Sequence, residues 1–158
     1  MDKPLSVVIA ALIHNNKILL IKRERGDYVG YWGLPGGKIE KQEHLSDAAV
    51  REIKEESGIT SEFKCHLGFV SEHLTENNEI QQHFLLHICE LKPATTSITC
   101  DEAGKLDWFD LNQISQIKEK IIPSDYMIIK NMINSRNNNY YNCVLEKQGE
   151  NHILKKFS

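Results

Sequence analysis

Two apolar runs near the start of the chain predict a β-hairpin. Residues 5–13 are mostly aliphatic, and residues 17–22 repeat that pattern after a polar break. Asn15 and Asn16 occupy the break, and asparagine tolerates the left-handed backbone of a tight hairpin turn. We therefore predict two antiparallel strands that meet at these asparagines.

Further apolar stretches bounded by turn-forming residues predict more strands. They are residues 31–32, 62–74, 80–91 and 104–111, together with a closing hairpin in 140–157 that turns at 148–150. Polar segments at 23–31, 75–78 and 92–103 are predicted to be loops or turns. The segment Pro35-Gly36-Gly37 predicts a sharp turn.

Two segments have the spacing of helices. Ser46 is positioned to cap a helix that ends near Ser57, with Gly58 as its stop signal, and a second helix is predicted over residues 124–134. Leu45, Ala49 and Ile53 form an apolar stripe that would dock the first helix on the sheet. Strands interleaved irregularly with helices predict an α/β domain with a mixed sheet over residues 1–158.

Three glutamates stand close together in the first predicted helix. Glu52, Glu55 and Glu56 fall within an arc of about 100° at 3.6 residues per turn, so they share one face. Like charges repel there unless a hard divalent cation such as Mg²⁺ or Mn²⁺ is bound, because such cations select carboxylate oxygens. Ala48 and Ala49 would leave space beside the carboxylates for a ligand. The alternative is a solvated charged face.

Composition narrows the functional classes. A net charge of −3 gives no bulk attraction for nucleic acid or an anionic membrane. The first residues have neither a signal-peptide pattern nor an apolar span of about 20 residues. The four cysteines are scattered and have no C-x-x-C pair, which is typical of free thiols in a reducing compartment. We therefore expect a cytoplasmic protein without a membrane or nucleic-acid polymer as partner, as a monomer or homodimer.

The spacing of residues around the glutamates matches a family motif. The fixed positions are Gly37, Glu43, Arg51, Glu52, Glu55, Glu56 and Gly58. Seven such matches arise by chance on the order of 10⁻⁹ per starting residue at average residue usage. The chain resembles the Nudix hydrolases of MutT type over Gly37 to Ile59, and the order of its predicted strands resembles the Nudix α/β/α sandwich.

The resemblance implies an enzyme that uses Mg²⁺ or Mn²⁺ to cleave a pyrophosphate bond in a nucleoside diphosphate linked to another group. It implies that Glu52, Glu55 and Glu56 bind the metal, and that Glu52 is also a candidate general base. Arg51 would brace the motif through Glu43, or alternatively contact phosphate.

Residues outside the glutamate face are implied as well. Gly36 would offer a backbone carbonyl to the cation, and Glu102 a further carboxylate, although Glu102 is equally well explained as a solvated loop residue. Glu76 and Glu79 are alternative candidates for the base. Gly37 in the turn and the positive charge of Lys38 would contact phosphate, and Arg23 is a further candidate for substrate binding.

The latter half of the chain resembles the 8-oxo-dGTP diphosphatase branch. Pro123 and Asp125 are similar to a proline–acid pair that meets a purine, although Gly33 replaces a base-reading asparagine and Ser124 a second acid. The ring of the base would stack on an aromatic side chain. The candidates are Tyr28, Tyr31, Trp32 and Phe84.

The expected substrate is a small nucleotide, namely a purine nucleoside triphosphate, oxidised or not, cleaved to the monophosphate and pyrophosphate. ADP-ribose or a nucleotide sugar is the alternative substrate. The alternative of another class is a non-catalytic Nudix-like module that only binds a ligand.

Overall fold

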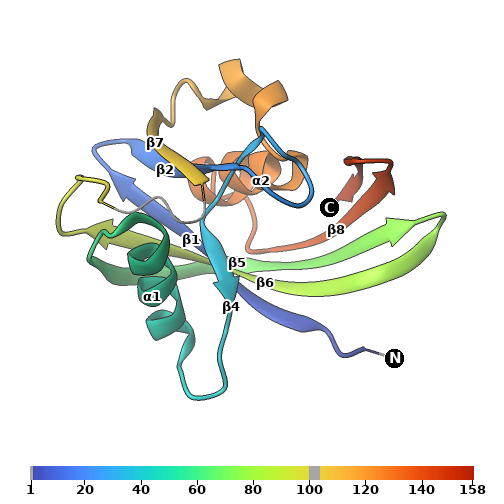
Figure 1. The fold of residues 1–158 in the computed structure, drawn as a ribbon, viewed down its shortest axis with the longest axis horizontal. Coiled ribbons are helices and arrows are strands. Elements are labelled where there is room, and N and C mark those ends of the chain that lie inside the picture. Colours follow the sequence, from blue (N-terminus) through green and yellow to red (C-terminus); the bar gives the residue numbers. More distant parts are fainter. Residues whose placement is uncertain (1, 100–103) are drawn as a thin grey trace.

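The computed structural model describes residues 2–99 and 104–158 (Figure 1). The strands are β1 (Leu5–His14), β2 (Lys17–Arg23), β3 (Trp32–Gly33), β4 (Gly36–Lys38), β5 (Ser61–Glu76), β6 (Glu79–Pro93), β7 (Gly104–Asp110), β8 (Tyr140–Gln148) and β9 (Asn151–Phe157). The helices are α1 (Leu45–Ser57), the 3₁₀ helix η1 (Ile114–Lys120), α2 (Pro123–Ile128) and the π-helical η2 (Ile129–Asn134), which continues α2. Glu102 lies outside the described residues.

The strands form a mixed sheet in the order β3-β2-β1-β6-β5-β8-β9, with β4 paired to β1 and β7 to β2. The β1–β6 and β5–β8 pairs are parallel, whereas β1–β2, β5–β6 and β8–β9 are antiparallel. Asn15–Asn16 and Asn77–Asn78 have positive φ angles at the tips of two hairpins, as expected of asparagine in tight turns. The sheet is therefore mixed, as predicted.

Helices cover the sheet on both faces (Figure 1). Along β1, Val8, Ala10 and Leu12 pack in one apolar cluster with α1. Ile9 and Ala11 point the other way, into a cluster with α2 and η2. This alternation follows from the two-residue period of a strand, and it buries β1 on both sides. The result is a helix–sheet–helix sandwich.

The segment at Gly36 and Gly37 is a strand, so the predicted sharp turn is wrong. Gly36 pairs with Ile9 and Gly37 with Val8, and neither glycine has a positive φ. A Cβ on Gly36 would collide with the backbone oxygen of Val8, and a Cβ on Gly37 with the carboxylate of Glu52. These glycines are needed for close packing rather than for a turn.

Helix α1 differs from its prediction at the start. His44 occupies the N-cap position, no side chain caps the helix, and Ser46 lies inside the first turn. Gly58 ends the helix as predicted, in the left-handed conformation with its N–H bonded to the Lys54 carbonyl. Ala48 and Ala49 are fully buried against the sheet, so they leave no space for a ligand, contrary to the prediction.

No helix in residues 2–99 or 104–158 is long and apolar enough to cross a membrane. Cys65, Cys89 and Cys143 are free thiols.

Candidate functional site

Arg51 organises the exposed face of α1. Its guanidinium makes a two-point ion pair with Glu43, with Nη2 at 2.6 Å and Nε at 2.9 Å from the two carboxylate oxygens. Its Nη1 also donates to Glu52 at 2.9 Å and to Glu55 at 3.1 Å, and Nη2 donates to the Lys38 carbonyl at 3.1 Å. Hydrogen bonds from Arg51 lower the pKa of Glu43 to about 2. Arg51 thus links the loop after β4 to two of the three motif glutamates.

Glu52 and Glu56 lie deeper than Glu55 and interact directly. Each carboxyl group shifts the pKa of the other, and the Gly36 backbone lowers the pKa of Glu56. Burial, and next the charge of Glu52, raise the pKa of Glu56 to about 8. Burial also raises the pKa of Glu52, although Arg51 opposes that rise. Burial and the charge of Glu52 therefore favour the protonated form of Glu56 at the inner edge of this face.

The donor set fits a divalent cation. Two half-buried carboxyl groups with raised pKa values mark a place where positive charge is favoured, and hard cations take carboxylate oxygens there. In residues 2–99 and 104–158, however, no three acid, imidazole or thiol side chains converge as ligands. Mg²⁺ commonly keeps several waters and uses one or two carboxylates, so a site with two carboxylates, such as Glu52 and Glu56, is compatible with this cation.

A small cavity of about 250 Å³ adjoins Glu56. Arg23, Arg25 and Gly36 also line it. The Arg23 Nε donates to the Asp27 carbonyl at 2.7 Å, which fixes the guanidinium within the β2–β3 loop. Two arginines beside an acidic cluster can attract the phosphates of a nucleotide. The sequence analysis did not predict a role for Arg25. The available signal was that Arg23 and Arg25 stand close together at the end of a predicted strand.

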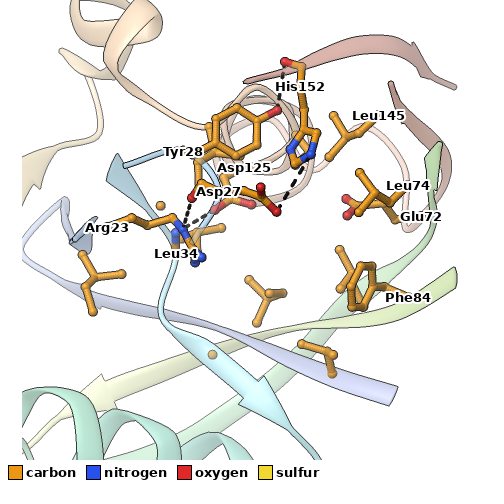
Figure 2. A pocket seen from close by; sticks show the side chains of 18 of the residues that line it. Arg23, Asp27, Tyr28, Leu34, Glu72, Leu74, Phe84, Asp125, Leu145 and His152 are labelled. Carbon is orange, nitrogen blue, oxygen red and sulfur yellow. Dashed lines mark hydrogen bonds and ion pairs between the residues drawn. The ribbon is translucent and has the colours of Figure 1, made fainter. Parts of the chain in front are cut away.

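A larger cavity of about 310 Å³ extends from Gly36 and Gly37 toward the C-terminal hairpin (Figure 2). Phe84, a predicted stacking residue, forms part of its apolar wall with Leu74. Tyr28 lines it as well, and its hydroxyl donates to the His152 carbonyl at 2.9 Å. The cavity therefore combines apolar walls with a few polar groups, as ligand sites usually do.

Asp125 faces this cavity from the start of α2, where the sequence placed it. Its Oδ2 accepts a hydrogen bond from the Leu34 N–H at 2.9 Å, so it also ties α2 to the chain between β3 and β4. Burial raises the pKa of Asp125 to about 6. A Cβ on Gly33 would lie 2.8 Å from this same Oδ2 and 2.9 Å from Ile122. Because Gly33 has no side chain, the Asp125 carboxyl group can occupy the space beside it.

We expect Gly33→Ala to destabilise the fold by about 1–3 kcal/mol, the usual cost of overpacking. The added methyl group would push Asp125 away from Leu34. Urea denaturation of the variant and the wild-type protein measures the difference. An unchanged midpoint and slope would show that Asp125 moves aside without cost.

The structure adds Glu72 and His152 to the cavity wall, and neither was predicted. Glu72 follows the buried Val70 by two residues on β5, so the period of the strand places it inside. This two-residue spacing from Val70 is the sequence feature that indicates a buried Glu72. It is easily overlooked, because a glutamate on a strand is usually assigned to the solvent face. His152 is 4 % exposed in its side chain, and Asp27 lies 4.0 Å from its Nε2.

Other predicted residues lie elsewhere. Trp32 packs edge-on against Phe109 and lines neither cavity described above. Tyr31 packs against Tyr28. The Lys38 side chain is exposed, and Glu76 and Glu79 pair at the tip of the β5–β6 hairpin, which extends away from α1 (Figure 1).

Comparison with known proteins identifies the family. The model of the NUDIX domain matches residues 3–131. The chain belongs to the Nudix hydrolase family. It is 38% identical over 135 residues to an ADP-ribose pyrophosphatase of Methanocaldococcus jannaschii, and the match covers 81% of this chain and 76% of that protein. It is 28% identical over 106 residues to the oxidized purine nucleoside triphosphate hydrolase of Mus musculus, covering 67% of this chain and 66% of that protein.

The fold agrees with this assignment. The structure of a mutator MutT protein from Bacillus halodurans superimposes with a TM-score of 0.75 at 21% identity, over 98% of this chain and 96% of that one. The chain spans 34% to 49% of the length of several further curated relatives. The predicted Nudix fold and the pyrophosphohydrolase class of this Nudix hydrolase are confirmed. Enzymes of this family act on nucleoside diphosphate-linked compounds and generally use divalent metals.

Proposed function

We propose that this Nudix hydrolase cleaves a nucleoside triphosphate to the monophosphate and pyrophosphate. The observation that carries the proposal is that the two cavities meet at Gly36. The 310 Å³ cavity, which is large enough for a nucleobase, reaches Gly36 and Gly37. The cavity with two arginines reaches Gly36 and Glu56. A base in the first cavity therefore places its phosphates between Arg23, Arg25 and Glu56.

The residues of the glutamate face have separable roles in this reaction. Glu52 is the proposed base, because it lies next to Gly37 and is oriented by the 2.9 Å hydrogen bond from Arg51. A carboxylate within hydrogen-bond reach of the attacking water can take its proton. Glu56 and Glu52 are proposed to hold the cation, with Glu55 and Gly36 as further candidate ligands. Glu102 stays a proposed ligand on sequence grounds alone.

A bound Mg²⁺ or Mn²⁺ would neutralise charge on the phosphoryl oxygens and make the attacking water more acidic. The chain itself supplies orientation. Arg51 holds Glu52 and Glu43 in fixed positions, which favours its role as a brace over direct contact with phosphate. Arg23 and Arg25 would attract the leaving pyrophosphate, since guanidinium groups match phosphate geometry.

The purine preference rests on Asp125 and Phe84. Phe84 offers an apolar surface against which a ring can pack, and Asp125 offers a carboxyl at the same cavity. The Mus musculus relative, whose name specifies oxidized purine nucleoside triphosphates, supports a substrate of this class. Gly33 leaves no amide side chain at its position to read the base, so oxidised and ordinary purines are both proposed substrates.

ADP-ribose is the second candidate substrate. The specific observation in its favour is the 38% identity to the archaeal ADP-ribose pyrophosphatase. Its adenine would occupy the same cavity, and the scissile bond would lie at the same glutamates. The two candidates therefore differ only in the group beyond the pyrophosphate.

A substrate panel with product masses separates the candidates. It contains the four dNTPs, oxidised purine dNTPs, ADP-ribose and a nucleotide sugar, each with Mg²⁺ and with Mn²⁺. We expect the highest kcat/KM for a purine triphosphate, with nucleoside monophosphate and pyrophosphate as products. A higher kcat/KM for ADP-ribose, with AMP and ribose phosphate as products, would replace this proposal with the second candidate. Binding without turnover of any compound would indicate the non-catalytic module.

A further inference from the structure

Glu72 is a buried acid that the roles above leave unused. It is 7 % exposed and lies in the middle of β5, between Phe84 on β6 and Cys143 on β8. Its side chain lines the 310 Å³ cavity, and Figure 2 shows it on the β5 side, facing the same hollow as Asp125. Its Oε2 is buried and has no hydrogen-bond partner among the described residues.

An unpartnered oxygen at this place is costly for the folded chain. Buried polar groups are nearly always hydrogen-bonded, because desolvation without a partner is unfavourable. The surrounding wall is apolar, with Leu74, Leu86 and Leu145 lining the same cavity. A leucine at position 72 would suit that wall better than a glutamate. The oxygen is therefore best explained by a ligand that supplies the missing partner.

The groups that face Glu72 favour its neutral form. Burial, and next the charge of Asp125 on α2, raise the pKa of Glu72 to about 7, and interactions of its carboxyl group with Cys143 and Ser124, which leave Oε2 without a hydrogen bond, oppose this only in part. No cation among the described residues forms an ion pair with it within 4.0 Å.

Two further titratable groups line the cavity from other elements. His152 on β9 has a lowered pKa, chiefly through burial, so its imidazole is neutral near pH 7. Tyr28 in the β2–β3 loop has a raised pKa, again chiefly through burial, so its hydroxyl keeps its proton. Arg23 lies near enough to Asp125 to stabilise that carboxylate. The nearby cation therefore stabilises Asp125, and Glu72 faces the negative charge of Asp125 and the uncharged groups of His152 and Tyr28.

We propose that Glu72 determines specificity, by donating its carboxyl proton to an acceptor atom of the nucleobase and accepting a hydrogen bond from an adjacent N–H of the same base. This inference rests on the proposed function, in which the cavity receives the base. A neutral carboxyl group presents a donor beside an acceptor, so it matches a base edge on which an acceptor lies beside an N–H. A ring without an N–H group at that edge satisfies only half of the pair.

Two substitutions separate this role from simple packing. Glu72→Gln keeps a donor and an acceptor but cannot ionise, whereas Glu72→Leu keeps the approximate size and removes both. Glu62→Gln is the matched control, because Glu62 lies on the same strand with an exposed side chain. Thermal unfolding of the three variants shows whether each one folds.

The test is the KM of the preferred substrate at pH 6 and pH 8.5. In the wild-type protein and the control, we expect KM to rise about 10-fold over this range as Glu72 ionises. In Glu72→Gln, KM should change less than 3-fold over the same range. In Glu72→Leu, KM at both pH values should be about 10-fold to 100-fold higher than the wild-type KM at pH 6. Its kcat should stay within about 3-fold of wild type, because the lost interaction stabilises the bound ground state and the transition state equally.

Two results would overturn the proposal. One is a wild-type KM in Glu72→Leu at pH 6, and the other is a rise of KM with pH in Glu72→Gln equal to that of the wild type. If the wild-type protein hydrolyses nothing, the proposed function fails, and calorimetry with AMP, GMP, CMP and UMP still decides the role of Glu72. Equal Kd values for the wild type and Glu72→Leu would then reject it, and a Kd at least about 10-fold weaker in Glu72→Leu would support it.

Discussion

Glu56→Gln is expected to lower kcat by at least about 100-fold while leaving the fold intact. Burial and the charge of Glu52 raise the pKa of Glu56 to about 8, and the Gly36 backbone opposes that rise. Glutamine has the shape of the protonated acid. It cannot become an anion, so the site loses the charge that a divalent cation requires.

Steady-state kinetics and thermal unfolding of Glu56→Gln test this expectation together. Glu62→Gln removes one carboxylate from an exposed position of β5 and should retain wild-type kcat. A Glu56→Gln variant with a normal unfolding temperature and with kcat within 3-fold of wild type would exclude Glu56 from catalysis. Glu52→Gln should show a comparable loss, since Glu52 is the proposed base.

Alanine substitutions of the two neighbouring glycines in β4 should affect different properties, one lowering activity and the other lowering stability. A Cβ on Gly37 would meet the end of the flexible Glu52 side chain, which can move. A displaced base costs rate, and we expect kcat of Gly37→Ala to fall about 10-fold to 100-fold. A Cβ on Gly36 would meet the backbone oxygen of Val8, which cannot move alone. Gly36→Ala should therefore destabilise the fold by about 1–3 kcal/mol.

Urea denaturation and kcat of the two glycine variants test this division. Each variant is the control for the other, because both add one methyl group to the same strand. If Gly37→Ala loses stability without losing kcat, Glu52 does not act as the base from its present position. If Gly36→Ala keeps wild-type stability, the β1–β4 pairing is looser than the register of Val8 and Ile9 implies.

The sequence predicts the placement of the three glutamates on one helix because that arrangement is local. Glu52, Glu55 and Glu56 lie within one helical turn and a half, so helix geometry alone puts them together. The Arg51–Glu43 ion pair spans eight residues and joins the helix to the loop before it. Short separations of this kind leave the chain few alternative arrangements. The same is true of the two hairpins that turn at asparagine pairs.

Features that depend on distant segments were missed or misread. Gly36 and Gly37 have the composition of a turn, but pairing with β1 some thirty residues away makes them a strand. Ala48 and Ala49 suggested space for a ligand, but the sheet fills that space. The two-residue period of β5 places Glu72 on the buried face, but only the packing of β5 beside β8 and near Asp125 of α2 makes that face part of the cavity. We propose that substrate choice depends on such residues, and it is therefore less predictable from the sequence than the reaction.

Product analysis in ¹⁸O-labelled water tests the central claim most directly. Purine nucleoside triphosphate is incubated with the wild-type protein, with Glu56→Gln, and with the wild-type protein in excess chelator, and the products are weighed by mass spectrometry. We expect nucleoside monophosphate and pyrophosphate, with one ¹⁸O incorporated per turnover, from the wild-type protein with Mg²⁺ or Mn²⁺ alone. Release of nucleoside diphosphate and inorganic phosphate, or equal turnover in all three samples, would contradict a metal-dependent pyrophosphohydrolase centred on Glu52 and Glu56.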